Sequence, residues 1–326
     1  MGRDAGADLQ PDRRPVLHDH RSESEDLVSD RDILPGPATG LVPTVEASPD
    51  KLALRRFLRN PAAVAGTIAL VIVVVVTLIG PIISPFEPTA IDLTQVRKPP
   101  SGEHLLGTDS TGRDVFSRLL AGGQISLLVG FSAALVAVAF GTLAGVVAGW
   151  FGGIVDAIIS RIIDIMLSVP AVLVIIVLAG VIGPSVPMLI IVIAGLAWPN
   201  PARIARGVVL SLREEEFVQA ARAIGSRTRF ILARHLVPGA LPPIVVSATL
   251  LVAESVLLES SLSFLGAGVQ PPQSSWGNML NEAQSLTVLS SMPWLWVPPG
   301  LMIAVIVLSA MAIGDGIRDA IDPRKN

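Results

Sequence analysis

The composition of the sequence, its uncharged runs and the placement of its arginines predict an all-α integral membrane protein with six transmembrane helices. Of the 326 residues, 51% are hydrophobic and 16% are charged, whereas a soluble domain keeps roughly a quarter of its residues charged. Residues 62–83 and 165–198 carry no charged side chain. In water, such runs would cost about 25 cal/mol per Å² of apolar surface, so we expect a lipid environment.

Composition also excludes several classes of function. The chain has no cysteine, which rules out disulfides, iron–sulfur clusters and a thiol nucleophile. Its net charge of −3 is unsuited to nucleic acid as a partner. The four histidines lack any spacing that would hold zinc, and no nucleophile pattern is present, so we predict no metal site, no catalytic residue and no enzymatic activity. Residues 1–50 are polar and predict a disordered cytoplasmic tail, followed by a membrane domain over 51–326.

The first span is predicted over residues 62–83, since a bilayer needs about 20 residues of helix. Four basic residues precede this run: Lys51, Arg55, Arg56 and Arg59. By the positive-inside rule, they place the N-terminus in the cytoplasm. Residues 84–123 are mixed and rich in proline, and predict an external loop with a short helix near 111–120. We expect Asp109 to cap that helix.

The second and third spans are predicted over residues 124–149 and 158–182. Gly141, Gly145 and Gly149 recur at four-residue spacing and leave one helix face nearly bare, which favours close helix packing within this chain or against a second membrane chain. Pro170 predicts a kink in the third span. At its start, three charged residues predict a paired cluster at the membrane interface or an ion path; they are Asp156, Arg161 and Asp164.

Charge asymmetry determines the remaining spans. Residues 203–234 contain seven arginines, whereas residues 262–296 contain no lysine or arginine, so the first segment is expected in the cytoplasm and the second outside. A fourth span must therefore run from residue 186 across two prolines toward Arg203. The fifth and sixth spans follow over residues 239–258 and 297–314, and both termini are expected inside.

Residues 213–238 (REEEFVQAARAIGSRTRFILARHLVP) predict a helix, a glycine turn and a second helix between two spans. Glu216 and the two acidic residues before it suit the positive end of a helix dipole. Gly225 is a natural left-handed stop, and Ser226 could cap the next helix. Such a segment is either an ordinary surface hairpin or a docking element for another protein.

QAARAIG followed by HLVP resembles the cytoplasmic signature loop of binding-protein-dependent ABC importer permeases, a Glu-Ala-Ala, three residues, Gly, and later Pro. Matching positions are Ala220, Ala221, Gly225 and Pro238, and Gln219 stands where the family usually has Glu. Residues 104–130, 262–280 and 314–324 resemble the dipeptide/oligopeptide/nickel branch, in its second or C-type permease subunit. The resemblance implies the type I importer permease fold.

The resemblance further implies partners and a location. These are a homologous permease chain, two ATP-binding subunits or domains, and an extracytoplasmic substrate-binding protein, in a bacterial inner membrane. It also implies that Glu216, Gln219, Ala220, Ala221, Gly225 and Pro238 belong to the loop that couples to the ATPase. The chain itself has no Gly-Lys-Ser/Thr phosphate loop, so ATP and Mg are expected on partner subunits and no cofactor on this chain.

Two carboxylates in and just after the fifth span have no assigned role. Glu254 and Glu259 are expected on roughly one helix face, where they either link to a neighbouring helix or line the translocation path. For substrate, the resemblance implies short peptides, with nickel chelates or glutathione as alternatives. An ion-coupled secondary carrier is an alternative of another class, although no inverted repeat is evident.

Overall fold

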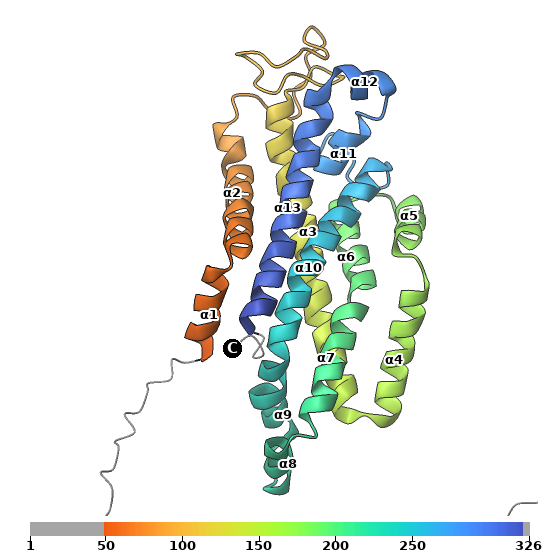
Figure 1. The fold of residues 1–326 in the computed structure, drawn as a ribbon. Coiled ribbons are helices and arrows are strands. Elements are labelled where there is room, and N and C mark those ends of the chain that lie inside the picture. The colour runs from red at the N-terminus through yellow and green to blue at the C-terminus, as the bar shows by residue number, and fades with distance from the viewer. Residues whose placement is uncertain (1–48, 322–326) are drawn as a thin grey trace, which may run out of the picture. The chain divides into compact units, whose positions relative to one another are not determined.

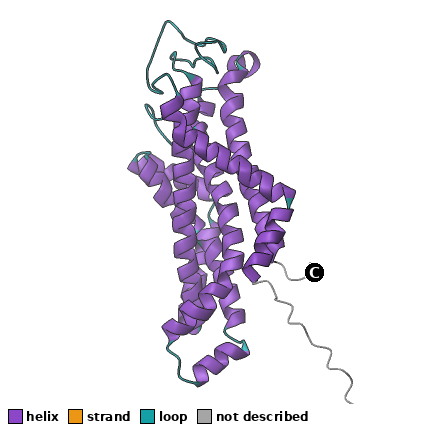
Figure 2. Cartoon of the chain, turned by 90° about the vertical axis from the view of Figure 1, so that its left-hand side faces the viewer, coloured by secondary structure: helices purple, strands orange, loops and turns teal. Residues whose placement is uncertain are grey.

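A computed structural model describes residues 49–321; residues 1–48 and 322–326 lie outside the described part, and so does almost all of the predicted tail over 1–50. The described residues form helices and loops without strands, and the longest loops lie at one end (Figures 1 and 2). Five helical segments are long and apolar enough to cross a membrane, or six if one bent pair counts as a span. The predicted helical membrane fold is therefore confirmed.

The chain enters the bundle through two helices in sequence, α1 (Pro49–Arg59) and α2 (Pro61–Ile83). Asn60 separates them in an extended conformation, and its Oδ1 accepts hydrogen bonds from the backbone N–H groups of Ala62 and Ala63. Pro61 follows in the first turn, where a missing N–H costs nothing. The break at Asn60 therefore starts the first span one residue earlier than the apolar run.

The second span is α3 (Val115–Phe151), a single helix of 37 residues. The separate short helix predicted near 111–120 is wrong, because Ala121 to Gln124 continue in helical geometry. Asp109 is not the cap. Asp114 occupies that position, and its carboxylate accepts hydrogen bonds from the backbone N–H and hydroxyl of Ser117 at 2.7 Å each.

The glycine face of α3 packs inside this chain. A methyl group at Gly141 would lie 2.4 Å from the carbonyl oxygen of Trp198, and one at Gly145 would lie 2.2 Å from that of Ala202. Gly149 meets the side chain of Val209 in the same way. These neighbours belong to the polypeptide that forms the fourth span, so the packing interpretation is confirmed.

The third span is broken. Helices α4 (Gly153–Ser168) and α5 (Ala171–Ile182) meet at an angle of 82°, with Pro170 as the N-cap of α5. The kink predicted at Pro170 is confirmed, and it is sharp enough to turn the chain almost perpendicular.

The spacing of the charged residues at the start of the third span predicts that they pair with one another. In the structure, the two acidic residues instead pair with arginines of the next span. Arg206 forms a bidentate ion pair with Asp156, one of its bonds being 2.7 Å. Arg203 binds Asp164 at 3.1 Å. Both arginines lie in α7 (Pro199–Leu212), so the pairs tie two spans together.

The fourth span crosses its prolines as predicted, since α6 (Val186–Ala197) and α7 form one membrane-length segment. The fifth and sixth spans are longer than expected: α10 covers Val237–Phe264 and α13 covers Pro293–Ile321. Two short helices lie between them, α11 (Trp276–Asn281) and α12 (Leu286–Ser291). A group of short elements joins α7 to α10: α8 (Glu216–Ala223), α9 (Thr228–Ile231) and a π-helical turn (Leu232–Leu236).

Helices α3, α10 and α13 form the centre of the bundle, with α2 on one side and α4 to α7 on the other (Figure 1). Residues 84–114, α11 and α12 lie at one end, hereafter the α12 end, and residues 213–236 lie at the other, the α8 end. Segments that the charge pattern predicts on opposite sides of the membrane are thus at opposite ends.

Candidate functional site

The segment 213–238 forms a compact helix–turn–helix at the α8 end. Helix α8 ends at Ala223, and Gly225 follows the C-cap residue with a φ of +77°, in the left-handed region that glycine adopts without strain. The N–H of Gly225 donates to the carbonyl of Arg222, and the N–H of Ser226 donates to that of Ala221, each at 3.0 Å. These two hydrogen bonds together form the Schellman motif. The predicted glycine stop is confirmed.

The second half of the segment differs from expectation. Ser226 does not cap α9; Arg227 occupies the N-cap position, without a side-chain cap bond. From Thr228 the chain runs through the π-helical turn into α10 with no loop, and together they form a membrane-length segment ending at Phe264. Pro238 lies in the first turn of α10. The segment is therefore joined directly to the fifth span.

One side of the segment carries apolar side chains that the described chain leaves about half exposed or more, although Phe217 and Phe230 each contact the ring of His235. Phe217 is 48% exposed, Ile224 82% and Phe230 54%. Glu216, Gln219 and Ala220 are exposed on α8 as well. Exposed apolar patches of this kind mark protein or membrane contacts.

The opposite side of α8 packs inward. Val218 is fully buried among residues of α3, α7 and α10, and Ala221 packs partly against the same cluster. The two alanines of the signature therefore have different surroundings: Ala220 faces out, whereas Ala221 helps hold α8 in place.

Two contacts link the segment to the end of α3, and no local pattern in the sequence predicts either of them. The guanidinium of Arg222 lies 4.2 Å from the ring centroid of Trp150, a cation–π contact. Arg213 donates from Nη1 to the carbonyl oxygen of Gly149 at 3.0 Å. Displacement of α8 would therefore act on α3 as well as on α10.

Glu259 is fully buried where α10, α3 and α11 meet. Its Oε2 accepts a hydrogen bond from Ser126 at 2.8 Å, and its Oε1 accepts one from Ser263 at 2.7 Å. The hydroxyl of Ser126 in turn accepts from the backbone N–H of Trp276 at 3.2 Å. This geometry is that of a structural link between helices.

Glu254 is in a different environment. Its side chain is exposed, and it forms no hydrogen bond or ion pair with any described residue. The prediction that Glu254 and Glu259 share one face is wrong, because five residues of α-helix turn a side chain through about 140°. Glu254 instead aligns with Leu250, Leu257 and Ser261, which are also exposed.

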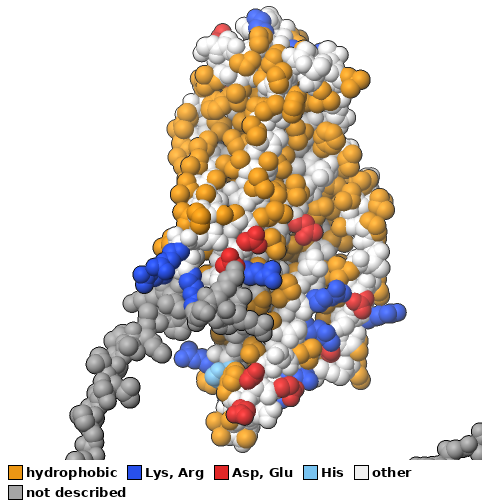
Figure 3. All heavy atoms as spheres, viewed as in Figure 1, with side chains coloured by type: hydrophobic (Ala, Val, Ile, Leu, Met, Phe, Trp, Pro, Cys, Tyr) orange, Lys and Arg blue, Asp and Glu red, His pale blue; other side chains and the backbone are white. Residues whose placement is uncertain are grey.

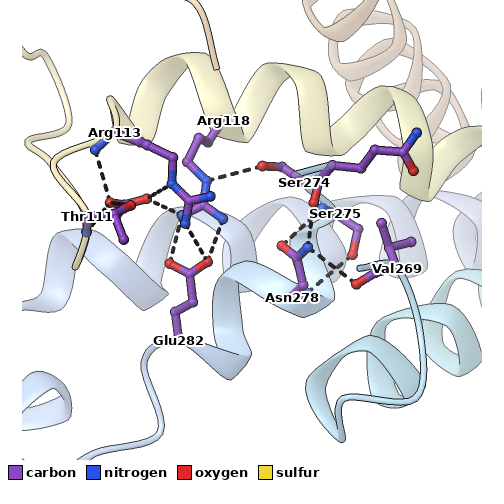
Figure 4. A network of polar contacts seen from close by, with 10 residues as sticks. Thr111, Arg113, Arg118, Val269, Ser274, Ser275, Asn278 and Glu282 are labelled. Atoms are coloured by element: carbon purple, nitrogen blue, oxygen red, sulfur yellow. Dashed lines mark hydrogen bonds and ion pairs between the residues drawn. The ribbon is translucent and has the colours of Figure 1, made fainter. Parts of the chain in front are cut away.

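At the α12 end, two buried arginines form a cluster with the buried Asp109 and the half-buried Glu282 (Figure 4). Arg118 donates from both terminal nitrogens to Glu282, at 2.7 Å each, and also binds Asp109. Arg113 bridges the same two carboxylates, at 2.8 Å to Asp109 and 3.0 Å to Glu282. We call these four residues the arginine–carboxylate cluster. It joins the loop before α3 to the end of α11.

The cluster fixes the charge state of Asp109. Burial alone would raise the pKa of this carboxyl group. The positive charge of Arg118 and the backbone N–H groups of Thr111 and Arg113 outweigh that effect, and the pKa lies below its usual value. Asp109 is therefore held ionised, and its role is structural.

A second buried pair lies beside the cluster. His104 Nδ1 lies 2.9 Å from Asp114 Oδ1, and the imidazole stacks on Phe86 with ring centroids 4.6 Å apart. In the described part of the chain, no group of three or more His, Cys, Asp or Glu side chains could hold a metal ion.

Comparison with known proteins agrees with these features. Residues 141–326 match the family described as binding-protein-dependent transport system inner membrane component. Residues 48–100 match the N-terminal transmembrane domain of oligopeptide transport permease C.

Individual relatives cover most of the chain. A protein of Brucella suis, provisionally named a peptide permease, is 44% identical over 82% of this chain and 89% of its own length. The dipeptide transport system permease protein DppC of Alkalihalophilus pseudofirmus is 39% identical over 85% of this chain and 90% of its own. A chain from the MetNI methionine ABC transporter aligns with a TM-score of 0.48 and 20% identity, over 63% of this chain and 96% of that chain. By the family match and the two relatives that are 44% and 39% identical, the chain belongs to the inner membrane components of binding-protein-dependent transport systems, in the branch of peptide permeases.

Proposed function

We propose that this chain is a permease subunit that couples ATP hydrolysis by partner subunits to the import of short peptides. Family membership supports the transport role. The observation that carries the coupling role is the segment 213–238, which presents uncovered apolar side chains at one end of the bundle and continues directly into a membrane span. A patch on another protein could bind there and move α10.

The attachment of the segment supports transmission of movement. Helix α8 is held by Val218 in the core cluster and by Arg222 on Trp150, and Arg213 at the end of α7 holds the start of the segment on Gly149. Such packed contacts transmit displacement because close-packed interiors deform little. Glu216, Gln219, Ala220 and Gly225 form the proposed docking side, with Ala221 and Pro238 positioning α8 and α10 behind it.

The partners follow from this role: two ATP-binding subunits or domains at the α8 end, a homologous permease chain beside this one, and a substrate-binding protein at the α12 end. ATP and Mg would be bound by the ATPase subunits, and this chain would catalyse nothing itself. The location proposed is a bacterial inner membrane, with the α8 end and both termini in the cytoplasm, because seven arginines lie within residues 203–234.

Glu254 is the residue we assign to the translocation path. A carboxylate in contact with lipid near the bilayer centre costs about 2.5–3.5 kcal/mol on insertion scales. The exposed face of α10 with Glu254 is therefore expected to adjoin water or protein. Farther along α10, a groove of about 430 Å³ continues from that face, lined by Leu257, Ser261, Phe264 and neighbouring residues. Glu259, buried among serines, is assigned to structure and not to the path.

Co-purification tests the permease role. The chain, isolated from native membranes in mild detergent and analysed by mass spectrometry, should bring a homologous permease and ATP-binding polypeptides with it. Isolation of the chain alone, under conditions that preserve other membrane complexes, would instead favour a secondary carrier or a scaffold.

Peptides are proposed as substrates because both named relatives carry peptide transport in their names. The test compares uptake of labelled di-, tri- and pentapeptides, nickel and glutathione by cells with and without the gene. Loss of peptide uptake supports the assignment. Unchanged peptide uptake with loss of nickel or glutathione uptake would show that the substrate is not a peptide, and would leave the permease role intact.

A further inference from the structure

Helix α1 has three distinct sides. Phe57 packs toward α13, where its ring would lie 3.2 Å from a methyl group placed at Gly316. Leu54 and Leu58, four residues apart, are 59% and 61% exposed. Arg55 and Arg59, also four residues apart, form a neighbouring exposed side. Residues at this spacing stand one above the other on a helix.

The two arginines are available for a partner outside the chain. Neither Arg55 nor Arg59 forms an ion pair or hydrogen bond with a described residue. Figure 3 shows Lys and Arg side chains gathered over α1, at the lower edge of the hydrophobic surface. The acidic residues of the contacting helix α13 are Asp315 and Asp319, and Asp319 already has a partner. The outer side of α1 is therefore positively charged.

The position of α1 along the membrane normal is set by α2. The first span begins at Pro61, only one residue after α1 ends. The outer side of α2 is apolar and open, since Ile68 and Ile72 are each 55% exposed. The hydrocarbon core is about 30 Å thick and headgroups add roughly 5–7 Å on each side. We therefore expect the last turns of α1 at headgroup level, continuous with the exposed apolar side of α2.

We propose that α1 is a binding site for anionic phospholipid, with Arg55 and Arg59 on the phosphate groups and Leu54 and Leu58 against the acyl chains. Charge complementarity selects a lipid over another apolar surface, because a purely apolar partner would leave two arginines without counter-charges. Guanidinium groups bind phosphate oxygens in a bidentate manner, and a basic side chain near an anionic membrane contributes about 1 kcal/mol. This inference does not depend on the substrate or on the ATPase.

Native mass spectrometry of the full chain, with any subunits that accompany it, tests the charge component. Dioleoyl phosphatidylglycerol is titrated and its adducts are compared with those of dioleoyl phosphatidylcholine. The double variant Arg55→Gln/Arg59→Gln should bind phosphatidylglycerol about 25-fold more weakly, about five-fold for each arginine. Arg55→Lys/Arg59→Lys, which keeps the charge, should stay within a few-fold of wild type.

The matched control is Arg227→Gln/Arg229→Gln, which removes two exposed arginines at the α8 end, outside α1, and should leave phosphatidylglycerol binding unchanged. Equal binding by the Arg55/Arg59 glutamine variant and wild type would overturn the proposal. Monodisperse elution of each variant shows that it is folded.

A depth measurement identifies the occupant. Because the chain has no cysteine, Leu58→Cys can be spin-labelled without removing others from it. In vesicles of phosphatidylcholine with phosphatidylglycerol, the label should be accessible to oxygen and shielded from a water-soluble nickel reagent. A label shielded from both reagents only when the other permease is present would show a protein partner at α1 and would contradict the lipid assignment.

Discussion

Arg118 and Glu282 lie 164 residues apart in the sequence, and their bidentate ion pair joins the start of α3 to the residue that ends α11. Removal of one member from a buried pair leaves the other charge uncompensated, which costs about 3–5 kcal/mol. The cluster therefore holds the α12 end in one arrangement, where a binding protein would approach. The residues of the cluster therefore stabilise the conformation of this end of the molecule and are assigned no catalytic role.

Asp109 supplies a pH test of this cluster. Its pKa is lower in the folded protein than in the unfolded chain, so its stabilisation is fully present above about pH 3.9 and is lost as pH falls through the folded value. Asp109→Asn should therefore lower the unfolding temperature in detergent by an amount that stays constant from pH 7 to 5 and shrinks below pH 4.

The matched control is Asp92→Asn. Asp92 is exposed, and its lowered pKa comes first from the hydrogen bond that the Thr94 side chain donates, so little change in unfolding temperature is expected. A difference for Asp109→Asn that already shrinks between pH 7 and 6 would contradict the assignment of an ionised, clamped carboxylate.

Helices approach most closely where α3 meets α7, and glycine makes that distance possible. A methyl group at Gly145 would overlap the backbone of Ala202, and overpacking of this kind costs about 1–3 kcal/mol. Gly145→Ala should therefore lower the unfolding temperature in detergent.

Gly207 provides the control, since it lies in α7 with open space around it. Gly207→Ala should leave stability unchanged or raise it by about 0.5–1 kcal/mol through helix propensity. Equal effects of the two substitutions would mean that the glycine face is not a packing contact.

The turn in the segment 213–238 can be altered without a steric clash. A Cβ at Gly225 meets no atom within 4 Å, so only its positive φ opposes a larger side chain. Gly225→Val should strain the turn by about 1–2 kcal/mol and tilt α8 against α9. The expected result is impaired peptide uptake with altered ATP hydrolysis, while the complex still assembles.

Asparagine tolerates the left-handed conformation, so Gly225→Asn is the control and should retain most uptake. Unimpaired uptake by Gly225→Val would show that the geometry of this turn is not needed for coupling.

At the scale of the whole molecule, topology is testable by labelling. Ser101→Cys and Thr287→Cys lie at exposed positions at the α12 end, and Ser211→Cys lies at the end of α7, toward the α8 end. An impermeant thiol reagent added to intact cells should label the first two and not the third. Labelling of Ser211→Cys from outside would reverse the proposed orientation.

Local patterns predicted most of this architecture, and long-range contacts did not follow from them. Apolar runs located the spans, and Pro170 and Gly225 marked a break and a turn because proline and glycine act on their own backbone. Asp109 and Glu259 were harder to interpret. Asp109 binds Arg118, which is 9 residues away, and Glu259 binds Ser126, which is 133 residues away. The residues next to Asp109 and Glu259 in the sequence do not predict these partners.

Uptake by the reconstituted complex tests the central claim most directly. Proteoliposomes with the chain and its co-purified subunits receive a labelled tripeptide and the binding protein on the α12 side, and ATP on the α8 side. Uptake should require ATP hydrolysis and persist when ionophores remove all ion gradients. Uptake driven by an ion gradient without ATP would contradict the account.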